Sequence, residues 1–179
     1  MGELKELMLR TPRLTLAVAE SVTCGRVQSR IGEISGASEF FLGGITAYTV
    51  AQKVRHLGVE HPAAAACDGV AAEVAAQMAC GAAALFGADV AVATTGYAER
   101  VASGGKPAGE NGPAGPSMGH EPFGFWAVAW RGETHQWQTR TGKVVALGAA
   151  RVMAQEMIAA AALAELLAQL RAMRDSQKG

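Results

Sequence analysis

The spacing of apolar positions changes along the chain, and each change marks a predicted element. Apolar residues recur at helical spacing over 3–10, and the largely apolar run RLTLAVA at 13–19 is typical of a buried strand. The pattern then predicts a helix over 23–34, a strand over 41–50, and a short helix that ends at Gly58, where glycine can take the left-handed capping conformation. Strands and helices thus alternate from the start.

The second half continues this alternation and adds two adjacent strands. An alanine-rich helix is predicted over 69–87 and a buried strand over 88–96. Two strands around a turn at 131–133 follow, and then a long Ala/Leu-rich helix over 144–173. This order predicts an α/β protein, a single-domain three-layer α/β/α sandwich with a mostly parallel sheet.

One segment of the pattern belongs to neither helix nor strand. Residues 97–122 contain six glycines and four prolines. Loops without secondary structure become uncommon beyond ~12–15 residues. We therefore expect this segment to be either a lid or a disordered loop.

Composition narrows the class of protein. Half of the 179 residues are apolar, which favours one globular domain with a proper core. Sixteen basic residues balance sixteen acidic ones, so net charge gives no reason to expect a nucleic acid or a membrane surface as partner, and a small molecule is expected instead. The helix over 144–173 is interrupted by Arg, Gln and Glu, which argues against a membrane span. The alanine-rich helix over 69–87 offers a flat face for a homo-oligomer.

The cysteines and the amino terminus bear on the compartment. The three cysteines are an odd number at spacings unlike a zinc site. The terminus MGELKELMLR mixes charges every few residues and lacks the apolar stretch of a secretion signal. We expect a cytoplasmic protein with reduced thiols and with neither a metal nor a cofactor.

Polar residues follow the ends of three predicted strands. Ser21 follows the first strand, Tyr48 and Lys53 follow the second, and Thr95 and Gly96 end the third, directly after Thr94. If these strands are parallel, their carboxyl ends lie along one sheet edge, where such folds usually bind ligands. The topology therefore predicts that these residues converge.

This set of side chains suits nucleophilic catalysis. A serine hydroxyl needs a base, and lysine can be that base when burial lowers its pKa from about 10.4 toward ~7–8. Ser21 is the candidate nucleophile and Lys53 the candidate base. Backbone N–H groups around Thr23 to Gly25, at a helix start, could hold an oxyanion or a phosphate.

Each candidate also has a structural interpretation. Ser21 or Thr23 could simply cap a helix, and Lys53 could be a solvated helix residue. Tyr48 and the strand-end threonines could serve packing alone. Cys24 could be a reactive thiolate or a small buried thiol. The three tryptophans are typical of core and hairpin packing rather than base stacking, and SGGKPAG lacks the spacing of a phosphate-binding P-loop.

Four segments stand out together in the sequence: TLAVAESVTCG, FFLGGITAYTVAQKVRHLGV, VAAEVAAQMACGA and GADVAVATTGYA. In this order they resemble the C-terminal domain of the CinA family, which includes nicotinamide-nucleotide amidohydrolase. The family pattern A-E-S-x-T-G-G falls on residues 19–25, A-Y-S-n-x-x-K on 47–53, and the strand-ending V-T-G on 94–96. The resemblance implies a serine nucleophile at Ser21 with Lys53 as base, which hydrolyse the carboxamide of nicotinamide mononucleotide to the acid and ammonia.

The departures from the family pattern lie where substrate recognition would suffer. Cys24 replaces a glycine beside the nucleophile, and Glu99 and Arg100 replace the Gly-Pro that opens the loop. Val144 and Gly148 stand where the pattern G-D-R-x-x-x-R has basic residues that would help to hold a phosphate. Arg140, Lys143 and Arg151 are nearby substitutes.

Three functions remain open from the sequence. The chain could be an amidohydrolase of the mononucleotide, a serine amidase with another substrate, or a non-catalytic relative that binds a nucleotide or a protein partner. Under either enzyme hypothesis the catalytic residues are Ser21 and Lys53. The substrate contacts are then expected at Thr23, Gly25, Tyr48, Thr95, Gly96 and Arg100.

Overall fold

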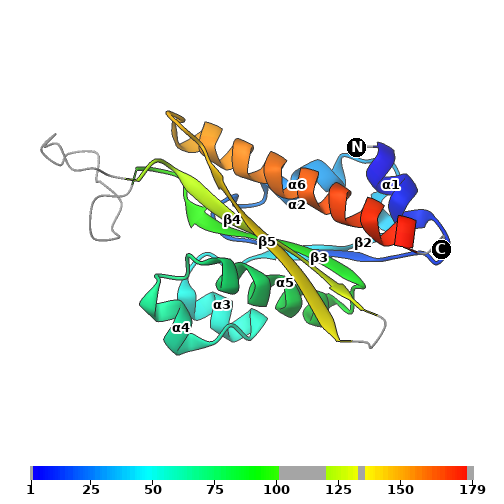
Figure 1. Ribbon diagram of the computed structural model, residues 1–179, viewed down its shortest axis with the longest axis horizontal. Coiled ribbons are helices and arrows are strands. Elements are labelled where there is room, and N and C mark those ends of the chain that lie inside the picture. Colours follow the sequence, from blue (N-terminus) through cyan, green and yellow to red (C-terminus); the bar gives the residue numbers. More distant parts are fainter. Residues whose placement is uncertain (1, 101–119, 133–135, 177–179) are drawn as a thin grey trace, which may run out of the picture.

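A five-stranded sheet lies between two layers of helices (Figure 1). The structure is a computed structural model, and it describes residues 2–100, 120–132 and 136–176. In chain order the elements are α1 (Gly2–Leu9), β1 (Leu16–Glu20), α2 (Arg26–Gly32), the 3-10 helix η1 (Ala37–Glu39), β2 (Phe41–Thr46), α3 (Val50–Leu57), α4 (His61–Ala66), α5 (Ala72–Phe86), β3 (Val90–Tyr97), β4 (Phe123–Arg131), β5 (Trp137–Val145) and α6 (Arg151–Ser176). The predicted three-layer α/β class is confirmed.

The strands follow the order β2-β1-β3-β4-β5. β1 lies between β2 and β3 and is parallel to both, with Val18 opposite Gly44 on one side and Val92 on the other. β4 runs antiparallel to β3, and β5 antiparallel to β4. The three strands predicted to be parallel therefore have their carboxyl ends along one edge of the sheet. The predicted strand pair, β4 and β5, extends the sheet beyond β3.

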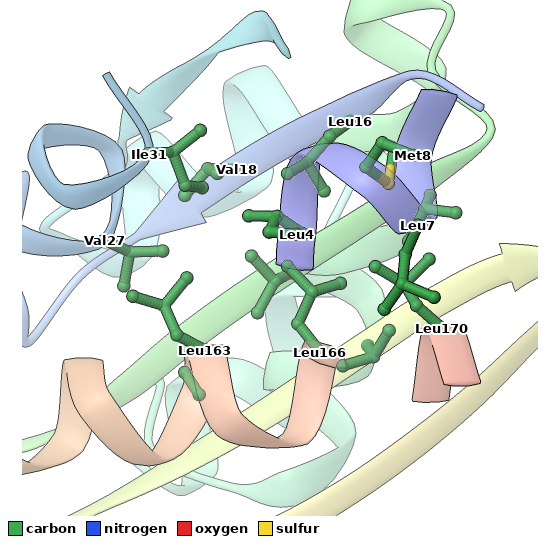
Figure 2. Packing of buried hydrophobic residues seen from close by; sticks show 14 of the residues in the cluster. Leu4, Leu7, Met8, Leu16, Val18, Val27, Ile31, Leu163, Leu166 and Leu170 are labelled. Carbon is green, nitrogen blue, oxygen red and sulfur yellow. The ribbon is translucent and has the colours of Figure 1, made fainter. Parts of the chain in front are cut away.

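The two faces of the sheet carry different side chains because successive residues of a strand point to opposite faces. In β1, Leu16 and Val18 join the cluster under α1, α2 and α6, whereas Ala17 and Ala19 face α5. Figure 2 shows the first cluster, in which residues of α1 and α2 meet the leucines of α6. Large side chains thus fill one interface, and small ones let a helix pack closely on the other.

The alanine-rich helix α5 uses its small residues inside the fold. Most of its buried residues are alanines, packed with Val74 and Met78 against the sheet. Gly81 lies where α3 crosses: a Cβ on it would come 2.1 Å from the carbonyl oxygen of Leu57. The face considered for a homo-oligomer is therefore largely covered by this chain's own sheet and by α3, and the oligomeric state stays a prediction.

The last helix begins later than the sequence pattern predicts. β5 continues to Val145, which pairs with Phe123, so residues 144 and 145 belong to a strand. Gly148 then turns the chain with φ +67°, and α6 starts at Arg151. By length and composition alone α6 could cross a membrane, but 44% of its apolar window is buried, and its leucines pack in the core shown in Figure 2.

Other differences concern the ends of elements. α2 spans Arg26–Gly32 rather than 23–34, because the first residues after β1 form a turn. β2 ends at Thr46, and Thr49 caps the helix that follows, so the predicted strand over 41–50 is too long. Residues 101–119 of the predicted loop and residues 133–135 of the predicted turn lie outside the described residues.

Candidate active site

A cavity of about 460 Å³ lies at the carboxyl ends of the parallel strands. Its walls come from the segments that follow β1 and β2, from the end of β3, from the connection between α4 and α5, and from the start of α6. Ser21, Tyr48, Lys53 and Gly96 are among the residues that line it. The structure thus brings these strand-end residues together, as the topology predicts.

Ser21 is held by the strand next to its own. Its backbone N–H donates to the carbonyl of Thr94 at 3.0 Å, so the residue continues the sheet for one position beyond β1. The residue is 5% exposed, and its hydroxyl donates a long hydrogen bond of 3.4 Å to the carbonyl of Tyr48. Ser21 is therefore a cavity residue with a fixed backbone and a weakly held hydroxyl.

The turn after Ser21 is built on the buried carboxylate of Glu20. This carboxylate accepts from the backbone N–H groups of Gly25, Val27 and Gln28 at 2.9–3.2 Å, and also from the Gln28 amide and the Thr23 hydroxyl. It thereby satisfies N–H groups at the start of α2, which otherwise lack partners. Capping by Ser21 or Thr23 was the alternative structural interpretation, but the group that binds these N–H groups is the carboxylate of Glu20.

This arrangement places two predicted substrate contacts away from the cavity wall. Thr23 is fully buried and shares its hydroxyl between Glu20 and Thr94. The Gly25 N–H is bound to Glu20, and the Cys24 N–H donates to the Ser21 carbonyl, so neither is available to an oxyanion. Among the described residues, the N–H of Val22, which lines the cavity beside Ser21, has no acceptor.

Cys24, which replaces a glycine of the family pattern, has a left-handed backbone conformation. Its φ is +49°, in the left-handed region that side chains disfavour, and its thiol is exposed. The residue is not part of the cavity wall. The substitution therefore strains the turn without filling the site.

Lys53 is buried rather than solvated. α3 begins after Thr49, whose hydroxyl accepts from the N–H of Gln52, and this start points Lys53 into the interior, where it is 2% exposed. Its amine donates to the Gly69 carbonyl at 2.9 Å and to the Thr95 hydroxyl at 3.0 Å. Burial lowers its pKa to about 8, although the charges of Asp68 and Cys67 act in the opposite direction.

Thr95 orients this amine instead of lining the cavity. It is fully buried and donates its own hydroxyl to the Gly69 carbonyl at 2.6 Å. Lys53, Thr95 and Gly69 thus form a closed triangle of hydrogen bonds. Ser21 and Lys53 line one cavity, but neither side chain donates to the other.

Of the remaining predicted substrate contacts, Tyr48 and Gly96 line the cavity and Arg100 does not. Tyr48 is 52% exposed at the rim, and its hydroxyl accepts from Arg151 at 2.9 Å. Gly96 lies against β4, where a Cβ would come 2.3 Å from the Phe123 carbonyl oxygen, so only glycine fits. Arg100 pairs with Glu121 at 2.6 Å, with its side chain 68% exposed, and it is not part of the cavity wall.

Sequence reasoning did not single out Asp68 or Tyr97, which line the cavity. It named Glu99 only as a departure from the family pattern and Arg151 only as a nearby basic substitute. Tyr97 donates to Asp68 at 3.1 Å, and burial together with this bond raises the pKa of Tyr97 to about 12. Arg151 donates to Glu99 at 2.8 Å. Asp68 follows α4, a helix that the sequence pattern did not separate from its surroundings, and no sequence signal marked it.

Comparison with known proteins identifies the family. The family model of the CinA C-terminal domain matches residues 3–111. The chain belongs to the CinA C-terminal domain family. Among its relatives, a CinA-like protein of Picosynechococcus is 38% identical over 123 residues, which cover 69% of this chain and 26% of that protein. A CinA-like protein of Citrifermentans bemidjiense is 43% identical over 98 residues, 55% of this chain and 24% of that protein. The chain thus spans about a quarter of the curated relatives it matches.

Solved structures of CinA proteins share the whole fold. The competence damage-inducible protein A of Klebsiella pneumoniae matches with a TM-score of 0.73 and 25% identity, over 95% of this chain and 94% of that one. The competence/damage inducible protein CihA of Agrobacterium tumefaciens matches with a TM-score of 0.72 and 26% identity, over 96% and 97%. The CinA fold therefore extends over nearly the entire chain.

Proposed function

We propose that the chain is a serine-lysine amidohydrolase that acts on a carboxamide. The observation that carries this proposal is that Ser21 shares one cavity with a lysine whose amine is almost completely removed from water. A lysine with a pKa of about 8 is partly unprotonated near neutral pH and can accept a proton from a serine. Lysines are seldom fully buried unless they are paired, and the described partners of this amine are a backbone carbonyl and a hydroxyl rather than a carboxylate.

In the proposed reaction, Ser21 is the nucleophile and Lys53 the base. The Ser21 hydroxyl turns from the Tyr48 carbonyl toward Lys53, gives its proton to the amine, and attacks the carboxamide carbon. The carbonyl oxygen becomes an oxyanion, which the N–H of Val22 can bind. Lys53 returns the proton to the nitrogen, the C–N bond breaks, and ammonia leaves an ester on Ser21. Water then attacks this ester with Lys53 again as base, which releases the carboxylic acid and restores the serine.

The resemblance to nicotinamide-nucleotide amidohydrolase suggests nicotinamide mononucleotide as the parent substrate. Holding its phosphate requires charge-assisted contacts, each worth roughly 1.5–3 kcal/mol. Val144 and Gly148 provide none at the positions where the family pattern is basic. We therefore expect weak turnover of this nucleotide and faster turnover of another amide.

A non-catalytic relative that binds a nucleotide or a protein partner is the second candidate. The observation that favours it is the hydrogen bonding in the cavity: the Ser21 hydroxyl is directed to a backbone carbonyl, and the Lys53 amine to Gly69 and Thr95. An unliganded amidohydrolase can show the same arrangement, because catalytic hydrogen bonds often tighten only when substrate binds.

Ammonia release from a panel of amides distinguishes the two candidates. The panel contains nicotinamide mononucleotide, nicotinamide riboside and simple aromatic carboxamides, tested with the wild type, Ser21→Ala and Ser29→Ala. Ser29 is an exposed serine on α2 and is the matched control. We expect at least one amide to be hydrolysed, with loss of ~10³-fold or more of the rate in Ser21→Ala and none in Ser29→Ala. Hydrolysis that survives Ser21→Ala would contradict the proposal, and no hydrolysis of any amide would favour the binding protein.

A further inference from the structure

Arg151 is the only arginine in the described wall of the cavity, and it already has partners. One of its nitrogens donates to Glu99 at 2.8 Å and another to the hydroxyl of Tyr48 at 2.9 Å. Glu99 lines the cavity as well. The guanidinium that a phosphate would be expected to use is therefore neutralised by a carboxylate within the same cavity.

This pairing discriminates against an anionic ligand group. A phosphate that binds Arg151 must displace Glu99 or share the guanidinium with it, and two anions close together repel each other. Glu99 stands at the first position of the Gly-Pro that the family pattern has at this point, so the competing carboxylate is a property of this chain.

Asp68 adds a second carboxylate to the same cavity. It has a left-handed backbone with φ +52°, and it directly precedes Gly69, whose carbonyl holds Lys53 and Thr95. The Tyr97 hydroxyl donates to one oxygen of this carboxylate, and the side chain remains exposed at the cavity. Asp68 is thus fixed by its turn and by a tyrosine, with room for a cationic partner.

We propose that this cavity selects a positively charged, phosphate-free carboxamide, whose cation faces Asp68 while Glu99 excludes a phosphate from Arg151. The proposal rests on the proposed amidohydrolase function and specifies its substrate class. Among the described residues that line the cavity, Lys53 and Arg151 balance the charges of Asp68 and Glu99 while the lysine is protonated. When Lys53 is unprotonated and acts as a base, these four residues together carry one net negative charge, which favours a monocation. A pyridinium nucleoside meets these conditions, whereas the corresponding mononucleotide, which carries a 5′-phosphate, does not.

Binding to the Ser21→Ala protein tests this specificity without relying on turnover. Calorimetry compares nicotinamide riboside, nicotinamide mononucleotide and benzamide riboside, a neutral nucleoside of similar shape. We expect the cationic nucleoside to bind ~10-fold or more tightly than either of the others, since one charge-assisted contact is worth at least that factor. Equal or tighter binding of the mononucleotide would overturn the proposal, and so would failure of the cationic nucleoside to bind.

Two further substitutions, each added to Ser21→Ala, assign the roles. Glu99→Gln should free Arg151 and strengthen binding of the mononucleotide ~10-fold. The matched control is Glu165→Gln, which removes the carboxylate that pairs with Arg140 and should leave this binding unchanged. Asp68→Asn should weaken binding of the cationic nucleoside ~10-fold and leave benzamide riboside unaffected. No gain in Glu99→Gln, or equal losses for both nucleosides in Asp68→Asn, would contradict the assignment.

Failure of this inference can be distinguished from failure of the proposed function. If the cationic nucleoside binds as expected but the wild type releases no ammonia from it, the specificity holds and the amidohydrolase activity is refuted. If the wild type hydrolyses the mononucleotide efficiently and Ser21→Ala binds it more tightly than the nucleoside, the amidohydrolase stands and the inference about Glu99 and Asp68 is overturned.

Discussion

At the residue scale, the burial of Lys53 makes stability depend on pH. Its pKa falls from 10.5 to about 8 because the folded chain shields the amine from water. Below pH 8 both folded and unfolded chains carry the proton, and the buried charge is unfavourable. Between about pH 8 and 10.5 the folded chain has released this proton and the unfolded chain still binds it, so the free energy of unfolding rises with pH.

Comparison with Lys53→Met measures this contribution. Methionine has similar length and no titrating group, so other pH effects largely cancel in the difference. We expect the wild type to gain about 3 kcal/mol relative to this variant between pH 8 and 10.5, measured by urea unfolding, because each pKa unit corresponds to ~1.4 kcal/mol. A difference that does not change with pH would show that the lysine is not desolvated.

The residues that could be predicted from the sequence are those whose place depends on topology alone. Ser21, Tyr48 and Lys53 follow strand ends, and parallel strands bring such ends together. Asp68 and Tyr97 could not be assigned because their pairing depends on how the turn after α4 packs against β3. Thr23 and Gly25 were predicted as substrate contacts because they start a helix, but the sequence does not show that the carboxylate of Glu20 already uses that helix start.

At the scale of elements, Glu20 joins β1 to α2 and fixes the turn that presents Ser21. Its carboxylate is inaccessible to solvent and accepts five hydrogen bonds, three of them from backbone N–H groups. Helix caps usually come from the residue directly before the first turn. Here the capping group comes from the end of the preceding strand, so sequence rules for caps could not identify it.

Replacing this carboxylate by an amide should destabilise the fold. In Glu20→Gln the new NH₂ group faces donors where the second oxygen was, so at least one buried N–H loses its acceptor. We expect a loss of about 2–4 kcal/mol in the free energy of unfolding, because hydrogen bonds to charged groups contribute ~1.5–3 kcal/mol each. The matched control is Glu39→Gln, whose exposed ion pair with Lys5 should contribute less than ~1 kcal/mol. Equal effects of the two substitutions would show that the Glu20 network is not structural.

At the scale of the whole molecule, the layers fit because the sequence divides large and small apolar residues between the two faces of the sheet. Leucines and valines of β1 and β3 face α6, and alanines face α5. Apolar runs predict such buried strands, which is why the fold class could be obtained from the sequence. The exact starts of α2 and α6 could not be predicted in this way. α2 starts late because Glu20 holds the turn after β1, and α6 starts late because β5 extends by pairing with β4.

The close approach of α3 to α5 links this packing to the site, and Gly81 tests it. Alanine is the better helix former by ~1 kcal/mol, so propensity alone predicts that Gly81→Ala stabilises α5. A Cβ at this position, however, would lie 2.1 Å from the backbone oxygen of Leu57, and a backbone atom cannot yield as a flexible side chain can. We expect a net loss of ~1–3 kcal/mol in the free energy of unfolding, typical of an overpacked core.

The matched control is Gly32→Ala in α2, where the added Cβ meets nothing within 4 Å apart from its chain neighbours and the backbone of its own helix, so this substitution should be neutral or slightly stabilising. Because Leu57 and Lys53 lie on the same helix, a shift of α3 in Gly81→Ala also moves the amine away from Thr95 and Gly69. The rise of stability with pH between about 8 and 10.5 should then shrink in Gly81→Ala and persist in Gly32→Ala. If Gly81→Ala kept both the stability and this pH dependence, α3 would not pack against α5 as closely as the structure shows.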